Sequence, residues 1–193
     1  MWYEGHPTES LLCTAFSKDG IKWTKPVLGL EEWKGSKDNN IILQTGYLDA
    51  NCAAIVKAPN EKDPARKYKL YYWVGPQWTG DHLRGMGLKP TDQVVVEALK
   101  KMKAYKSAGQ YVAFSADGVN FTPKLDKPVV VFNDTPGLGD TSTVLFDEQA
   151  GCYRAYLRMI RNSRRCYSLA ESDDGVNFKP PVPVLDPTPE DDA

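Results

Sequence analysis

The sequence has no excess of charge of either sign and no long apolar run. Among its 193 residues, 24 are lysine or arginine and 25 are aspartate or glutamate, which gives a formal net charge of −1. A nucleic-acid-binding protein normally carries a basic excess, and a membrane-surface protein carries a basic cluster. Apolar runs such as residues 129–132 are too short to span a bilayer. We therefore expect neither a nucleic-acid nor a membrane partner.

Cysteine and histidine are scarce, and their spacing excludes the common zinc sites. The chain holds four cysteines and two histidines, at Cys13, Cys52, Cys152, Cys166, His6 and His82. No two cysteines form a C-x-x-C pair, so we expect no metal site and no cofactor. Four cysteines allow two disulfides without requiring them. The first ten residues lack the basic and apolar regions of a signal peptide, and the sequence leaves the cellular location open.

Three similar segments organise the chain. Residues 15–30, 113–131 and 170–185 share the pattern Ser-x-Asp-Gly-x-x-aromatic, followed by prolines and apolar residues. Asp-Gly between strand-like segments is a strong signal for a tight turn, because glycine accepts a positive φ. The prolines suit an edge strand, where a missing N–H does little harm. Each copy therefore predicts a hairpin that joins an inner strand to an edge strand, and we assign Asp19, Asp117 and Asp174 to turn structure.

Further strands are predicted before each hairpin. Aromatic strands cover residues 1–5, 68–75 and 153–160, and apolar strands cover residues 49–58 and 140–147. The resulting unit has four antiparallel strands, with the turn between the third and the fourth. Repetition of such a unit is typical of a β-propeller, in which each unit is a blade.

The whole chain, residues 1–193, is thus predicted to be one all-β, partial β-propeller domain of about two and a half blades. The half blade covers residues 1–30, and the full blades cover 49–132 and 140–185. The first full blade carries an insertion at 76–108 that contains a predicted helix at 91–106, a rim cover or a working lid. A closed ring needs at least four blades, so we expect either a longer chain or self-association.

Two aspartates are candidates for catalysis. Asp49 and Asp140 are predicted at equivalent starts of inner strands, with Ile55 and Phe146 each six residues further on. Inner strands converge on the propeller axis, so the two carboxylates would approach each other. Like charges in proximity raise the pKa of at least one carboxyl, which suits a general acid beside a base. The alternative is that each aspartate caps the chain where it enters a strand.

Side chains predicted at the same end of the blades are candidates for binding. Counting along the repeat places Glu4, Trp73 and Arg158 at one equivalent position. Trp73 and Trp78 could stack on a sugar ring, Arg158 could hold a carboxylate or hydroxyl, and Glu4 could be a third acid. The alternative is packing between blades with a buried ion pair. Weaker candidates are Asn40, which could bind a polyol or cap a turn, and His82.

The segments FSKDGIKWTKPVLGL…GSKDNNIIL, MWYEG, DPARKYKLYYW and SDDGVNF resemble the five-bladed β-propeller glycosidases of glycoside hydrolase families 32 and 43 and their bacterial relatives. Those families place two aspartates and one glutamate around an axial pocket. The resemblance implies that Asp49 and Asp140 are the inner-strand carboxylates. The acid would be Glu4 or a residue of another blade. It also implies a secreted or periplasmic protein. No clear Arg-Asp-Pro motif is present.

Two functions follow from these observations. The first is a glycoside hydrolase, or part of one, with paired carboxylates across a glycosidic bond. The second is a glycan-binding or structural propeller without catalysis. Both take a carbohydrate as the expected ligand.

Overall fold

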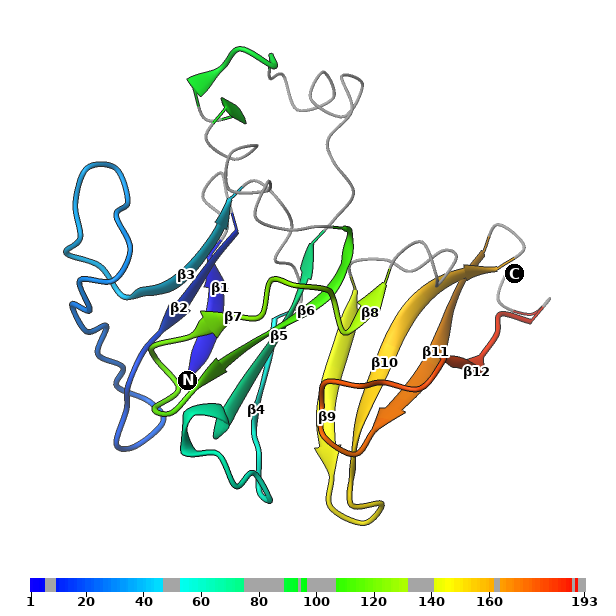
Figure 1. Ribbon diagram of the computed structural model, residues 1–193. Coiled ribbons are helices and arrows are strands. Elements are labelled where there is room, and N and C mark those ends of the chain that lie inside the picture. Colours follow the sequence, from blue (N-terminus) through cyan, green and yellow to red (C-terminus); the bar gives the residue numbers. More distant parts are fainter. Residues whose placement is uncertain are drawn as a thin grey trace.

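The computed structural model is built of antiparallel β-sheets joined by turns and loops. The structure describes residues 1–5, 10–46, 53–74, 89–93, 95–96, 107–131, 141–161, 164–188 and 190. The strands form three sheets that stand side by side in chain order (Figure 1). The prediction of an all-β fold of antiparallel strands is confirmed.

The first sheet has the strand order β1-β2-β3, with bounds β1 Trp2–Gly5, β2 Ser10–Thr14 and β3 Ile41–Gly46. The prediction that its edge strand directly follows the turn, within residues 1–30, is wrong. There only Thr24 bridges back to Phe16. Residues 25–40 instead form a largely exposed connection, from which Trp33 packs on a small buried cluster of the sheet. The chain pairs with β2 again only at Ile41.

The second and third sheets follow the predicted order more closely. The second contains β4 (Ala54–Lys57), β5 (Tyr68–Val74), β6 (Gly109–Ser115), β7 (Thr122–Pro123) and β8 (Val130–Val131). The third contains β9 (Ser142–Asp147), β10 (Cys152–Arg161), β11 (Arg164–Ser172) and β12 (Val182–Leu185). A 3-10 turn, η1 (Pro64–Arg66), precedes β5. In both sheets the strands after the turn form the edge, as the prolines predict.

The helix predicted at 91–106 is described only at its beginning. The carbonyl of Asp92 accepts the N–H groups of Val95 and Val96 at 2.9 and 3.0 Å, which forms one helical turn. The Asp92 carboxylate accepts the N–H of Lys89 at 2.8 Å. Residue 94 and residues 97–106 lie outside the described residues, so the rest of the helix stays a prediction.

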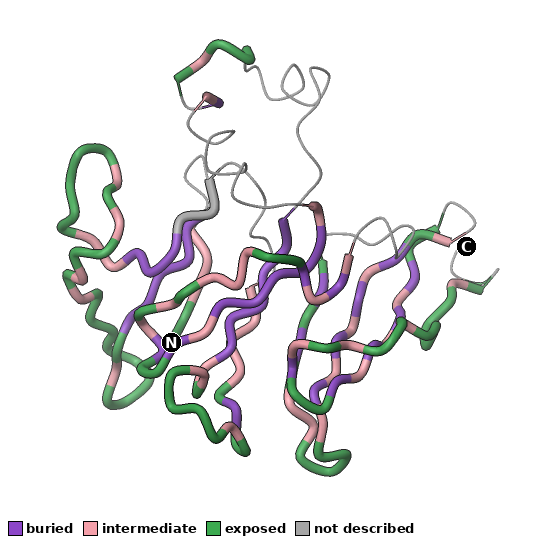
Figure 2. Tube along the Cα trace, viewed as in Figure 1, coloured by how far each residue is buried: buried purple, intermediate pink, exposed green. Residues whose placement is uncertain are grey.

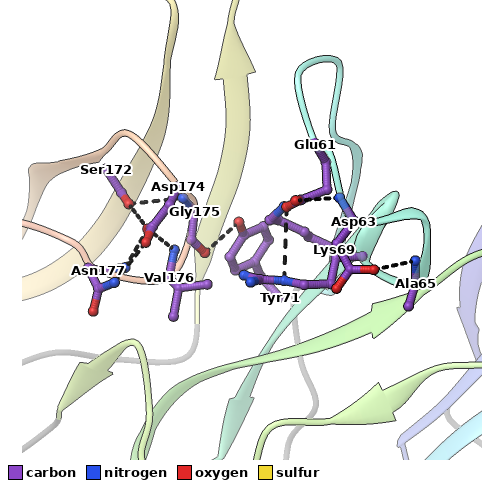
Figure 3. Close-up of polar contacts among 11 residues, drawn as sticks. Glu61, Asp63, Ala65, Lys69, Tyr71, Ser172, Asp174, Gly175, Val176 and Asn177 are labelled. Atoms are coloured by element: carbon purple, nitrogen blue, oxygen red, sulfur yellow. Dashed lines mark hydrogen bonds and ion pairs between the residues drawn. The ribbon is translucent and has the colours of Figure 1, made fainter.

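The Ser-x-Asp-Gly turn has the same hydrogen bonds in all three sheets. In the third sheet (Figure 3), Ser172 Oγ donates to Asp174 Oδ1 at 2.9 Å and accepts the N–H of Gly175 at 3.0 Å. The N–H groups of Val176 and Asn177 both donate to Asp174 Oδ1 at 2.8 Å. The same bonds recur in residues 17–22 and 115–120. The turn role is confirmed for Asp19, Asp117 and Asp174.

These turns make the fold sensitive to acid. Burial acts to raise the pKa of Asp174, but the N–H groups of Asn177 and Val176 lower it to about 2. The N–H and side-chain amide of Asn120 likewise hold the pKa of Asp117 well below its usual value. A carboxyl with a lowered pKa stabilises the fold above its unfolded pKa, and this contribution is lost as pH falls through the folded pKa.

We therefore expect the free energy of unfolding to fall by roughly 1 kcal/mol for Asp174 between pH 4 and pH 2, after allowance for solvent screening. Urea denaturation at the two pH values measures this change. Asp174→Asn should flatten the pH dependence, because the amide does not titrate. Asp173→Asn is the control, since Asp173 is exposed and takes no part in the turn bonds. Equal slopes for wild type and Asp174→Asn would contradict the assignment.

β5, in the middle sheet, is buried on both faces (Figure 2). Toward the first sheet, Leu70, Tyr72 and Val74 pack with Leu12 and Ile42. Toward the third sheet, the alternate side chains join a second cluster, whose members include Tyr71, Trp73, Val112, Val144, Ala155 and Leu157. The strands β4 and β9 also lie side by side. Each sheet thus packs face to face against its neighbour in chain order.

A hydrogen bond to the turn glycine links each sheet to the next. Trp2 Nε1 donates to the carbonyl of Gly118 at 2.7 Å, and Tyr71 Oη donates to the carbonyl of Gly175 at 2.9 Å (Figure 3). Trp2 and Tyr71 hold the same register position, because each pairs with the residue three positions before the serine of its own turn. An aromatic donor of one sheet therefore holds the turn of the following sheet.

Candidate functional site

The three side chains predicted at one equivalent position do share a register. Glu4 pairs with Leu12, Trp73 with Gln110, and Arg158 with Tyr167. Each of these partners lies five residues before the serine of its turn. The three residues therefore lie toward the end of β1, β5 and β10 that is remote from the turns. We call this end of the sheets the candidate site.

Glu4 connects the first sheet to the second. Its Oε1 accepts the backbone N–H of Ala53 at 2.6 Å, directly before β4. Asp49 precedes Ala53 by four residues in sequence but lies outside the described residues. The structure thus brings the carboxylate of Glu4 to the beginning of the strand that follows Asp49.

Arg158 lies within the third sheet, beside the beginning of β9. Its backbone N–H donates to the carbonyl of Thr141 at 3.2 Å, next to the start of β9. The Arg158 side chain is half-buried on the face of the third sheet that is turned away from the second. Asp140 directly precedes Thr141 in sequence and lies outside the described residues.

Trp73 is part of the core between the second and third sheets. Only 3% of the residue is exposed, and it belongs to the cluster that joins these sheets. A ring packed in this way presents no free face to a sugar. The structure therefore gives Trp73 the packing role that was the alternative interpretation. Trp78 and His82 lie outside the described residues.

Asn40 is a structural residue of the first sheet. Its Nδ2 donates to Tyr3 Oη at 2.7 Å and to the carbonyl of Thr14 at 2.8 Å, which uses both amide hydrogens. Asn40 also directly precedes β3, the edge strand of the first sheet. These bonds support the capping alternative over polyol binding.

The expected correspondence between Ile55 and Phe146 is wrong by two residues. Ile55 pairs with Leu70, and Val144 pairs with Ala155. Leu70 and Ala155 each lie opposite an alanine two residues before the serine of their turn, so they are equivalent. Ile55 therefore corresponds to Val144.

This shift changes how the two candidate aspartates correspond. Counted back along the sequence from Ile55 and Val144, the residue that matches Asp140 is Asn51, and Asp49 precedes that position by two residues. A shift of two keeps side chains on the same side of a strand. The spacing in the sequence led to the wrong correspondence because the connection before β5, residues 58–67, is longer than the connection before β10, residues 148–151.

Gln110 is a residue of the candidate site that the sequence analysis missed. It lies opposite Trp73, is 1% exposed, and neither its Nε2 nor its Oε1 has a hydrogen-bond partner in the described structure. An unsatisfied buried amide costs about 1–3 kcal/mol, so it is unusual in a residue that only packs. The signal available in the sequence was an amide at the position where the other sheets carry Leu12 and Tyr167.

Two hollows lined by described residues lie apart from the candidate site. One of about 400 Å³ adjoins the first turn and is lined by Phe16, Ser17, Lys18, Asp19, Lys22 and Thr24. The other, of about 270 Å³, lies between residues 129–131 and 178–181.

Within the described ranges no three acidic, cysteine or histidine side chains gather as metal ligands. A search of the same residues for a helix with the length and apolar character of a membrane span found none. Cys13, Cys152 and Cys166 are free thiols.

Comparisons of the chain with protein-family models, with curated proteins and with solved structures found no match.

Proposed function

We propose that the three sheets are blades of a β-propeller and that the protein acts on or binds a carbohydrate at the candidate site. The proposal is carried by one observation: the Glu4 carboxylate, toward the end of β1, accepts the N–H of Ala53 directly before the strand that follows Asp49, and Arg158 holds the equivalent register position in the sheet that follows Asp140. The repeated turn and the face-to-face packing of successive sheets support the propeller arrangement.

The chemistry of this end of the sheets suits a polyhydroxylated ligand. Carboxylates accept hydrogen bonds from sugar hydroxyls, and an arginine donates to ring and hydroxyl oxygens. In hydrolysis one carboxyl group protonates the leaving glycosidic oxygen. The other attacks the anomeric carbon or removes a proton from the attacking water. We assign Asp49 and Asp140 as the reacting pair, Glu4 as a third acid, and Arg158 as a binding residue.

Binding without catalysis is the second candidate function, and the position of Glu4 favours it. Its Oε1 is engaged by the Ala53 N–H at 2.6 Å, which ties this oxygen to the fold. If Glu4 only joins the sheets, the remaining carboxylates would bind a glycan without a third acid.

A glycan array followed by measurement of reducing-end release tests the proposal. We expect at least one oligosaccharide to bind, and Asp140→Asn to lower its hydrolysis by about 10²–10⁴-fold if Asp140 is an acid or base. Glu148→Gln is the matched control, because Glu148 is an exposed carboxylate in the connection between β9 and β10. It should leave binding and hydrolysis unchanged.

The outcomes separate the two functions. Binding with no hydrolysis, weakened by Arg158→Ala, would support the non-catalytic function. Failure to bind any glycan, or hydrolysis that survives Asp49→Asn and Asp140→Asn together, would overturn the assignment of the site.

A further inference from the structure

The three Ser-x-Asp-Gly turns have the same internal bonds but different surroundings. Gly118 and Gly175 are buried, and a Cβ on either would lie within 3.0 Å of an aromatic side chain of the preceding sheet. Gly20, in the first turn, is exposed, and a Cβ there would meet nothing within 4 Å. Ile21 beside it is 81% exposed. One of three equivalent turns therefore has its docking surface uncovered.

The third sheet carries the matching donor. Tyr156 pairs with Leu169, three residues before the serine of its turn, so it is equivalent to Trp2 and Tyr71. It is half-buried on the outer face of the third sheet, the face turned away from the second sheet. Its hydroxyl makes no hydrogen bond with any residue that the structure describes. Trp2 and Tyr71 each hold a turn glycine, whereas Tyr156 holds none within the described chain.

Other residues of this outer face also reproduce the covered face of the second sheet. Val56 of β4 packs against the core cluster, and its equivalent Leu145 is 40% exposed. Arg154 is equivalent to Lys69, because each pairs with the residue directly before the serine of its turn. Arg154 forms ion pairs with both Asp147 and Glu171, as Lys69 does with Glu61. The outer face thus has the donor, the apolar side chain and the cation of a face that receives a turn.

We infer that the first turn of one copy of this protein docks on the outer face of the third sheet of a second copy, with Tyr156 Oη donating to the carbonyl of Gly20. The turn side of the contact, the turn surface, consists of Phe16, Lys18, Gly20, Ile21, Lys22 and Trp23. It carries two lysines, and the outer face carries Asp147 and Glu171, which are paired with Arg154. This inference is independent of the proposed carbohydrate function.

A second copy is the occupant because both halves of the contact are present on this chain. Trp33 packs on the buried cluster at the outer side of the first sheet, but the turn surface stays exposed: Phe16 is 51% and Trp23 42% accessible. The carbonyl of Gly20 accepts Trp23 Nε1 at 3.0 Å, and its second lone pair is available for Tyr156.

The contact is head-to-tail, since each copy offers a different surface to each neighbour. Such contacts close into a ring of copies or continue into an open chain. We therefore expect the average mass in solution to rise with concentration above that of one copy.

Sedimentation equilibrium of the full chain over a range of concentrations tests the inference. Ile21→Asp, on the turn surface, and Leu145→Asp, on the outer face, should each weaken self-association at least tenfold. Tyr156→Phe, which removes only the hydroxyl, should weaken it several-fold. Val27→Asp is the control, because Val27 is 68% exposed but belongs to neither surface. Circular dichroism confirms that each variant is folded.

Mixing the variants gives the sharpest result. Ile21→Asp keeps an intact outer face and Leu145→Asp keeps an intact turn surface, so an equal mixture should form a 1:1 dimer and grow no further. A wild-type protein that stays monomeric at every concentration would overturn the inference. So would a mixture that associates no more than either variant alone, or a Val27→Asp variant that associates as weakly as Ile21→Asp.

Discussion

Replacing Gly175 with alanine should lower the free energy of unfolding by about 3 kcal/mol. Gly175 has a φ of +71°, where an L-residue costs about 1–2 kcal/mol. The added Cβ would also lie 2.5 Å from Tyr71 Oη and 3.1 Å from Tyr153 Cδ1, and both rings belong to packed strands. Overpacking of this kind costs about 1–3 kcal/mol. Chemical denaturation of the variant measures the sum.

The same substitution at the other two turns separates strain from packing. Gly20 has a φ of +74° and nothing within 4 Å of its Cβ, so Gly20→Ala should cost only the strain, about 1 kcal/mol. Gly118→Ala, with Trp2 Cζ2 at 3.0 Å, should fall between the two. Equal costs at all three glycines would show that the contact between sheets contributes nothing to stability.

Removal of the charge of Glu61 should have a comparable effect. Lys69 is fully buried, and its Nζ bonds Glu61 Oε2 at 2.7 Å and lies 5.3 Å from the centre of the Tyr153 ring. Glu61→Gln would leave this ammonium group buried without a counter-charge. The loss of one partner of a buried pair costs about 3–5 kcal/mol. We expect a value near 3 kcal/mol, because the glutamine oxygen still accepts a hydrogen bond.

Replacement of the lysine of this pair should change the free energy of unfolding only slightly. Lys69→Met replaces the cation by an apolar side chain of similar length, and Glu61, on the rim of the pair, then turns to solvent. We expect a change within about 1 kcal/mol, and the double variant should be close to Lys69→Met alone. Asp186→Asn is the matched control, because its pair with Arg161 is exposed and is worth less than about 1 kcal/mol. A Lys69→Met variant less stable than Glu61→Gln would refute this account.

Sequence reasoning succeeded where the determinants are local. The Ser-x-Asp-Gly turn is specified by four adjacent residues whose own side chains supply its hydrogen bonds, as at Asp174. Once the turns are known, counting along paired strands places Glu4, Trp73 and Arg158 in one register. This holds because the strand before each turn pairs without a bulge with the strand that precedes it.

It failed where the determinants lie in another part of the chain. β3 pairs with β2 across residues 15–40, and the cluster under Trp33 that permits this is not a local pattern. The burial of Trp73 depends on the third sheet, whose strands begin about 70 residues later. The bonds to Gly118 and Gly175 escaped notice because their donors are different residues and the acceptor is a backbone carbonyl, which every residue has.

In the part of the chain that the structure describes, each sheet packs against its neighbours in chain order, and this arrangement determines the order in which the parts of the molecule unfold. In such a linear array the stability is a sum of unit terms and nearest-neighbour terms. The second sheet shares in both contacts, and the outer sheets share in one each. Backbone amides of β5 and β6 should thus be the last to exchange with deuterated solvent, while the two ends of the array open first.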